Sequence, residues 1–147
     1  MTPDQWFEIA STIVLPGWLL LLIAPGWRYS AGLISGVIIP VLLGVLYTVL
    51  IVAYLGSSVG GFGSLSEISL VFENRWMLLA GWVHYLAFDL FVGSWEVRDS
   101  QRLGISRWLM IPCLLFTFLL GPVGLLAYLA LRWALRREFL LEGTAGA

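Results

Sequence analysis

Charged side chains are scarce in this sequence, and lysine is missing altogether. Only 12% of the 147 residues are charged, whereas roughly 25% are charged in an ordinary soluble protein. A net charge of -1 leaves no basic excess for a phosphate backbone, which argues against a nucleic-acid partner. The single cysteine, Cys113, has no partner for an intrachain disulfide. One histidine among scattered carboxylates is also too few ligands for a di-iron bundle, so no metal centre is expected.

Apolar side chains are what the chain has in excess, at 60% of its residues. A helix needs about 20 mostly apolar residues to cross the hydrocarbon core of a bilayer. Four stretches meet that length, at residues 6–24, 32–55, 76–95 and 108–133. Tryptophans mark their ends, as is typical of a membrane–water interface: Trp6, Trp27, Trp76, Trp95, Trp108 and Trp133. The sequence therefore predicts an all-α fold, a four-helix transmembrane bundle that forms one integral membrane domain over residues 1–147.

The connection between the second and third spans carries a further helical pattern. Leu65, Ile68 and Phe72 recur at helical spacing after a glycine-rich stretch, which predicts a short interfacial helix. A flexible glycine loop is the alternative.

Two features of the spans predict unusual packing. Gly32, Gly36 and Gly44 form a ridge of small residues on the second span, which favours close approach of another helix. Pro122 falls deep inside the fourth span, where it frees the carbonyl of Phe118 from its helical hydrogen bond. Inside a bilayer such a carbonyl needs a partner, either from packing around a kink or from a ligand.

The arginines divide evenly between the two ends of the four expected spans. One end carries Arg28, Arg98, Arg102 and Arg107, and the other carries Arg75, Arg132, Arg136 and Arg137. The positive-inside rule needs an excess on one side. The four-span arrangement therefore leaves the orientation open.

The third span holds two ionisable residues, which are costly inside a membrane and are functional candidates for that reason. At about 100° per residue, His84 and Asp89 point about 140° apart. The face of Asp89 also carries Trp82, Tyr85, Gly93 and Glu96, and the face of His84 carries Met77, Phe88, Phe91 and Trp95. Both can be buried only if this helix is surrounded on two sides, which predicts that it is the central helix. Structural roles stay open: an interhelical hydrogen bond for His84, and for Asp89 a partner such as Tyr85, Ser11, Thr12 or an arginine.

Residues 81–93 of this span, Gly-Trp-Val-His-Tyr-Leu-Ala-Phe-Asp-Leu-Phe-Val-Gly, resemble the W-[IV]-H-x-L-x-x-D-L-F signature of the abscisic-acid-deficient-four-like family. Gly121-Pro122-Val123-Gly124 is similar to the G-P-x-G segment of that family, and Leu15-Pro16 followed by Ala24-Pro25 resembles its first-helix pattern. Plant members are chloroplast membrane proteins required to make the xanthophyll neoxanthin. This chain begins with no transit-peptide or signal-peptide pattern, so we expect a multi-pass protein of a bacterial cytoplasmic membrane.

The resemblance implies a carotenoid-modifying enzyme, an epoxide-opening isomerase that needs no redox cofactor. Opening an epoxide to an allene requires a general acid at the epoxide oxygen and a base at carbon. We take Asp89 as the candidate acid and His84 as the candidate base of the catalytic pair. The residues expected to bind the substrate or pigment are Trp82, Tyr85, Phe88, Phe91 and Pro122.

A non-catalytic alternative also stays open. His84 on an aromatic helix face is a candidate axial ligand for a haem or chlorophyll-type pigment, and the aromatic side chains suit a carotenoid. The chain would then be a pigment-binding or assembly subunit of a larger membrane complex, or a homo-oligomer. In both cases the expected surroundings are the lipid bilayer and a carotenoid-like apolar ligand.

Overall fold

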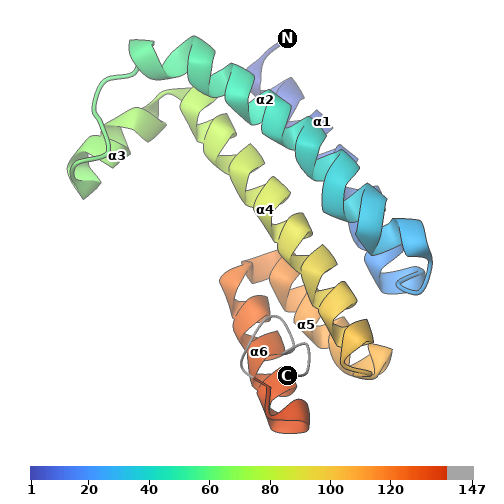
Figure 1. Cartoon of the computed structure of the whole chain (residues 1–147). Helices are drawn as coiled ribbons and strands as arrows, with labels where there is room; N and C mark the ends of the chain where they lie inside the picture. Colours follow the sequence, from blue (N-terminus) through green and yellow to red (C-terminus); the bar gives the residue numbers. More distant parts are fainter. Residues whose placement is uncertain (139–147) are drawn as a thin grey trace, which may run out of the picture.

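The computed structural model describes residues 1–138, and this part of the chain is helical with no strand. The elements are α1 (Pro3–Ile23), η1 (Ser30–Ile38), α2 (Ile39–Tyr54), η2 (Leu55–Ser57), α3 (Leu65–Glu73), α4 (Arg75–Arg102), α5 (Arg107–Leu120) and α6 (Pro122–Arg136) (Figure 1). Three stretches are long and apolar enough to cross a membrane: α1, the continuous run from η1 to η2, and α4. The predicted all-α class is confirmed.

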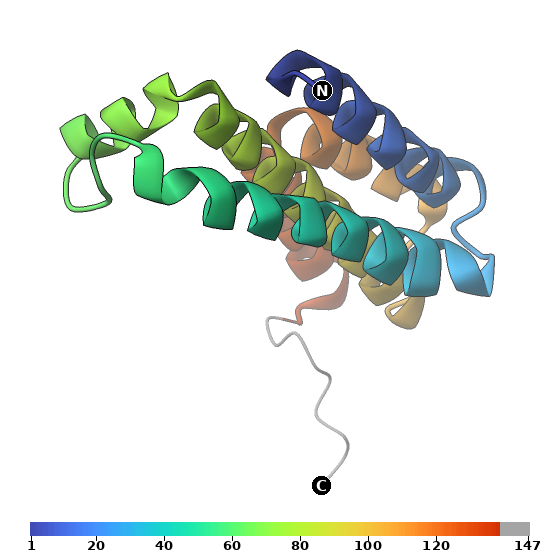
Figure 2. The ribbon, with the colours of Figure 1, turned by 90° about the horizontal axis from the view of Figure 1, so that it is seen from above.

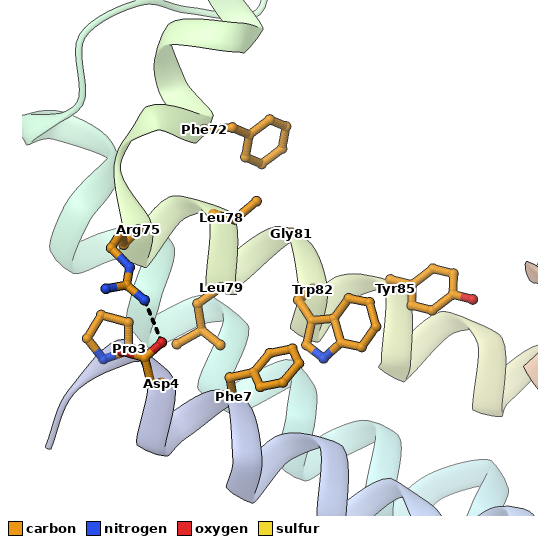
Figure 3. Close-up of a pocket in the computed structure, with 10 residues that line it drawn as sticks. All are labelled: Pro3, Asp4, Phe7, Phe72, Arg75, Leu78, Leu79, Gly81, Trp82 and Tyr85. Atoms are coloured by element: carbon orange, nitrogen blue, oxygen red, sulfur yellow. Dashed lines mark hydrogen bonds and ion pairs between the residues drawn. The ribbon is translucent and has the colours of Figure 1, made fainter. Parts of the chain in front are cut away.

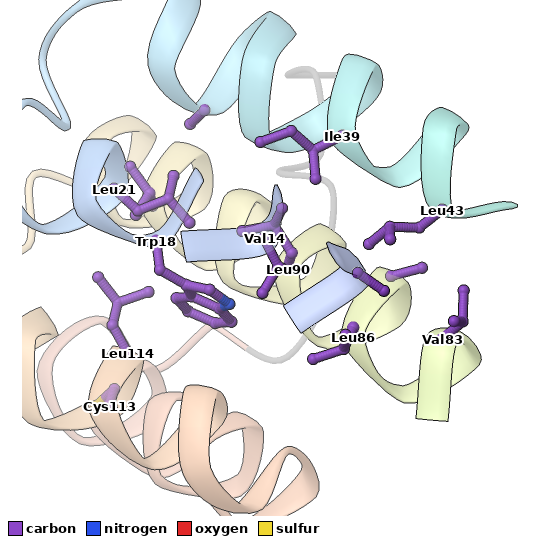
Figure 4. Packing of buried hydrophobic residues seen from close by; sticks show 14 of the residues in the cluster. Val14, Trp18, Leu21, Ile39, Leu43, Val83, Leu86, Leu90, Cys113 and Leu114 are labelled. Atoms are coloured by element: carbon purple, nitrogen blue, oxygen red, sulfur yellow. The ribbon is translucent and has the colours of Figure 1, made fainter. Parts of the chain in front are cut away.

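Helix α4 is the centre of the molecule, as its two polar faces predicted. It contacts α1, η1, α2, α3, α5 and α6, and α2 and the α5–α6 pair lie on opposite sides of it (Figure 2). Val83 and Leu90 of α4 have no exposed surface and belong to one core with Val14, Leu43 and Leu114 (Figure 4). The core is therefore built around α4, and α1, η1, α2, α5 and α6 each contribute buried residues to it.

Of the predicted glycine ridge, only Gly36 lies in a close contact. A Cβ atom built there would be 2.7 Å from Oγ of Ser94 on α4, whereas no atom lies within 4 Å of such an atom at Gly32 or Gly44. Helix η1 is π-helical over this region, so it has more residues per turn than an α-helix. Gly44 lies beyond it in the α-helical α2. Both Gly32 and Gly44 face open space, so the prediction is wrong for these two glycines.

The short helix predicted after the glycine-rich stretch is α3. Its first turn is capped by Ser64, whose Oγ accepts a hydrogen bond from the backbone nitrogen of Glu67 at 3.2 Å. Phe72, near its end, packs on Gly81 of α4, where a Cβ atom would lie 2.9 Å from the phenyl ring. Leu65 at its start is 84% exposed. Helix α3 therefore rests on α4 through its C-terminal half.

The fourth predicted span, residues 108–133, is not one helix. Helix α5 ends directly before Gly121, which has a φ of 48°, and α6 begins at Pro122. Proline cannot donate the helical hydrogen bond and its ring clashes with the preceding turn, while glycine adopts a positive φ without steric cost. The chain reverses here instead of kinking. A Cβ atom on Gly124 would lie 2.0 Å from the backbone nitrogen of Thr117, so the two backbones nearly touch.

The four-helix bundle is therefore corrected to three long helices and a helical hairpin, α5–α6, called the hairpin below. Its arms have 14 and 15 residues. At about 1.5 Å per residue each arm is about 21–23 Å long, less than the ~30 Å of a hydrocarbon core. Neither arm is long enough to cross a bilayer.

Candidate functional site

An apolar groove of about 540 Å³ runs between the start of α1 and the first turns of α4; we call it the α1–α4 groove. Figure 3 shows Phe7, Trp82 and Tyr85 in a row along it. The ring centroids are 5.3 Å apart for Phe7 and Trp82 and 5.4 Å apart for Trp82 and Tyr85. Trp82 is held in place because its Nε1 donates a hydrogen bond to Ser11 Oγ at 3.0 Å. Two of the predicted binding residues thus share one aromatic surface.

The outer end of the groove is polar. Arg75 of α4 forms an ion pair with Asp4 of α1, and both side chains are about two-thirds exposed, at 67% and 65% (Figure 3). Phe72 of α3 also lines the groove. A polar mouth and an apolar interior suit an elongated apolar molecule that carries a polar end group.

Asp89 lies one turn beyond Tyr85 on the same face of α4, and its carboxylate interacts with the Tyr85 phenol. The carboxylate is directed at the tip of the hairpin, where a Cβ atom on Gly121 would lie 2.7 Å from Oδ1. Its other oxygen, Oδ2, is buried and has no hydrogen-bond partner among residues 1–138. A buried polar atom without a partner is costly. This oxygen is therefore a polar atom whose hydrogen bonding the described residues leave unsatisfied.

His84 lies on the opposite side of α4 and is exposed. Its ring stacks on Phe88 at 4.5 Å and lies 5.5 Å from the ring of Tyr47 on α2. It borders a second hollow of about 280 Å³, which Ile51 and Phe62 also line. The structure therefore does not bring His84 and Asp89 to one site.

The remaining predicted binding residues lie on two further surfaces. Phe88 and Phe91 are 59% and 53% exposed and line a shallow hollow of about 240 Å³ beside Pro40. Pro122 is exposed at the tip of the hairpin. Only Trp82 and Tyr85 therefore lie on the same side of α4 as Asp89.

A cluster of polar side chains is buried between α4 and the hairpin; we call it the hairpin cluster. Its members are Glu96 and Asp99 of α4, Thr117 of α5, and Tyr128 and Arg132 of α6, and each is at most 5% exposed. Asp99 accepts a hydrogen bond from the Tyr128 hydroxyl and forms an ion pair with Nε of Arg132 at 2.8 Å. At the edge of the cluster, Arg102 forms a second ion pair with Asp99, also at 2.8 Å. These contacts fix the hairpin on α4, because removing one member of a buried pair leaves an uncompensated charge.

Helical periodicity places Glu96 on the face of Asp89, but the members of the hairpin cluster on α5 and α6 were not predicted. Tyr128 and Arg132 are four residues apart and share one face of α6. The signal that would have found them is the Gly121-Pro122 dipeptide, which is typical of a chain reversal. A reversal there makes α6 antiparallel to α5 and allows its polar face to meet α4.

The fold and the site define a small polytopic helical protein whose central helix carries a polar face toward a helical hairpin. Comparison with known proteins identifies the family. The sequence model described as ABA DEFICIENT 4-like matches residues 5–128. The chain belongs to the ABA DEFICIENT 4-like family, and the resemblance noted from residues 81–93 is confirmed. The match includes the α1–α4 groove, Asp89 and the hairpin cluster as far as Tyr128.

One curated relative is described as Protein ABA DEFICIENT 4, chloroplastic, from Arabidopsis thaliana. It is 27% identical to this chain over 142 residues, and the alignment covers 90% of this chain. The chain spans about 63% of the length of this relative. No solved structure matches the chain.

The expectation of a bacterial cytoplasmic membrane is contradicted by this relative, which is chloroplastic by its description. The expectation rested on the missing transit-peptide pattern. The absence of that pattern is not informative, because the chain spans only about 63% of the length of its relative.

Proposed function

We propose that this protein is an integral membrane protein of a plastid that acts on a xanthophyll, a carotenoid with oxygenated end rings. The membrane part of the proposal is supported by the three long apolar helices. It is also supported by a stripe of valines on α2 at helical spacing, Val41, Val45, Val49 and Val52, which are 56%, 60%, 57% and 80% exposed. Side chains of this kind face lipid tails without cost.

The observation that carries the carotenoid part is the α1–α4 groove, with Asp89 one helical turn beyond its lining residue Tyr85. The volume of the groove falls within the ~300–1,000 Å³ usual for small-molecule sites. Its row of three rings offers flat faces to a polyene. The buried Oδ2 of Asp89, which lacks a partner among the described residues, offers a polar contact to an oxygen on the end ring. Family membership supports the same class of ligand.

The reaction that we propose is the opening of an epoxide to an allene. Protonated Asp89 donates its proton to the epoxide oxygen as the C–O bond breaks. The carboxylate that remains takes a proton from the neighbouring carbon, and the C–H electron pair forms the second double bond of the allene. The product is an isomer of the substrate, so no oxidant or reductant is consumed. Acid–base catalysis by one positioned side chain contributes roughly 10²–10⁴-fold to such a step.

This reaction gives His84 a different role from the catalytic base that the sequence suggested. As a base, His84 would have to reach the ring that Asp89 protonates, but it faces the second hollow on the other side of α4. We therefore propose Asp89 for both proton transfers and a ligand contact, not proton transfer, for His84.

The test is conversion of an epoxy-xanthophyll by the purified protein in lipid, with the product measured by chromatography. We expect Asp89→Asn to lower the rate by about 100-fold or more while the carotenoid still binds. Glu8→Gln, which changes an exposed carboxylate on α1, serves as the matched control, and Trp82→Ala is expected to weaken binding. Full turnover in Asp89→Asn would refute the assignment of the acid. A wild-type protein that neither binds nor converts the carotenoid would refute the function.

A second candidate function is that of a pigment-binding subunit without turnover. It is favoured by the exposed His84 ring, which stacks on Phe88 next to the second hollow. An axial nitrogen in an aromatic setting suits a haem or chlorophyll-type metal. This candidate expects a visible absorption band in the gently purified protein, which His84→Ala abolishes and Asp89→Asn keeps. The opposite pattern favours the enzyme.

A further inference from the structure

Glu96 of the hairpin cluster has a role that the proposed reaction does not use. The residue is completely buried, at 0% exposure, as is Thr117 opposite it. The two carboxyl oxygens of Glu96 lie 3.0 and 3.1 Å from Oγ1 of Thr117. Among the described residues, this hydroxyl is the one hydrogen-bond partner that Glu96 has.

The contact between Glu96 and Thr117 has too few donor hydrogens to satisfy an ionised Glu96. An ionised carboxylate only accepts hydrogen bonds, at about four lone-pair positions. The Thr117 hydroxyl has one hydrogen to donate, and the carbonyl oxygen of Cys113 competes for it at 3.0 Å. With a proton on Glu96 the contact is satisfied. Glu96 then donates to Thr117, and Thr117 donates to the Cys113 carbonyl.

No cation faces Glu96 to stabilise a negative charge there. Arg132 of α6 pairs with Asp99 and donates to the carbonyl of Glu138 at 3.1 Å, and within residues 1–138 no arginine lies in ion-pair range of Glu96. The other titratable groups around it are acids, phenols or thiols: Asp89 and Asp99 on α4, Cys113 on α5 and Tyr128 on α6. Helix α1 presents Trp18 and Leu21 to this face of α4, at Gly93. Helix η1 contains no titratable residue.

We propose that Glu96 is a proton-binding site that joins α4 to the hairpin. The folded protein keeps a proton on this carboxyl, and the chain of hydrogen bonds from Glu96 through Thr117 to Cys113 depends on it. Without the proton, a buried charge would lie among oxygen acceptors with no cation beside it. Glu96 lies seven residues, two helical turns, beyond Asp89, and its contact with Thr117 involves no carotenoid. Failure of the proposed reaction would therefore not refute this proton-binding site, and failure of the site would not refute the reaction.

Infrared spectroscopy of the whole protein in detergent tests for this proton directly. At neutral pH we expect a carbonyl stretching band of a protonated carboxylic acid that shifts on deuteration. Glu96→Gln should lose one such band, and Asp89→Asn should keep that same band, because a band from protonated Asp89 is a separate one. Glutamine is a matched replacement, because its amide can donate to Thr117 as the carboxylic acid does. The proposal is overturned if the wild-type protein shows no such band or if Glu96→Gln leaves the band unchanged.

The pH dependence of unfolding gives a second measurement. The folded chain holds a proton that the unfolded chain releases above the ~4.3 pKa of a free glutamate, so the wild-type Tm should fall as the pH rises from about 5 to about 8. Glu96→Gln should show a smaller fall, and an equal fall in both proteins contradicts the proposal. If Glu96→Gln does not fold, Thr117→Val replaces it. That variant keeps the carboxyl and removes its partner, so the infrared band must shift; an unshifted band overturns the proposal.

Discussion

Gly124 decides at the level of a single residue whether the hairpin can close. A methyl group there would lie 2.0 Å from the backbone nitrogen of Thr117 and 2.1 Å from its Oγ1. Neither atom can move without separating α5 from α6. We expect Gly124→Ala to lower the free energy of unfolding by at least ~1–3 kcal/mol, the usual cost of overpacking. Chemical unfolding in detergent, followed by circular dichroism, measures it.

Gly44 provides the matched control for that substitution. No atom lies within 4 Å of a Cβ atom built at Gly44, so Gly44→Ala should be neutral or raise the stability by up to about 1 kcal/mol through helix propensity. Equal stability of the two alanine variants would show that α5 and α6 do not approach as closely as described.

The direction of a side chain was predictable from the sequence, but its partner was predictable only in part. Helical periodicity placed His84 and Asp89 about 140° apart, and the structure has them on opposite sides of α4. Of the candidate partners of Asp89, Tyr85 on the same helix interacts with it, whereas the Ser11 hydroxyl accepts from Trp82. The direction of a side chain depends on its own helix alone, whereas its partner depends on which neighbouring helix packs against it. Packing is not encoded locally, so the hairpin cluster was missed.

At the level of the elements, the hairpin and the predicted fourth span differ in a way that can be measured. A spanning helix would put residues 106 and 137 on opposite sides of the membrane, whereas the hairpin puts them on the same side. With Cys113→Ser as the background, we expect single cysteines at Ser106 and Arg137 to react with an impermeant reagent from one and the same side. A cysteine at Val123, near the tip, should be protected. Labelling of Ser106 and Arg137 variants from opposite sides would restore the four-span arrangement.

The three long helices and α3 were predictable, whereas the hairpin was not. Apolar length is sufficient to find a span, and the Leu65, Ile68 and Phe72 pattern was sufficient to find α3. Residues 108–133 also pass the length criterion, because hydropathy counts apolar residues and ignores backbone geometry. The break arises from the conformation of Gly121 and from the missing N–H of Pro122, which a hydropathy average does not record.

At the scale of the whole molecule, α4 separates the two candidate ligand-binding spaces. The α1–α4 groove and the hairpin lie on the side of Asp89, and the second hollow lies on the side of His84. Phe72 of α3 lines both spaces. A ligand in one space therefore lies on the side of one of the two motif residues and not of the other, which is why the two candidate functions predict different sensitive variants.

The reversal at Gly121 also predicts the orientation of the chain in a membrane. With α6 turned back, every arginine except Arg75 gathers at one end of the molecule, where the α1–η1 loop, the α4–α5 turn and the end of α6 lie (Figure 1). Asp4, Glu8, Glu67 and Glu73 gather at the other end. Basic residues are retained on the side from which a chain is inserted. We expect an epitope tag before Met1 to be translocated and a tag after Ala147 to stay behind, and protease protection of sealed vesicles distinguishes this orientation from its inverse.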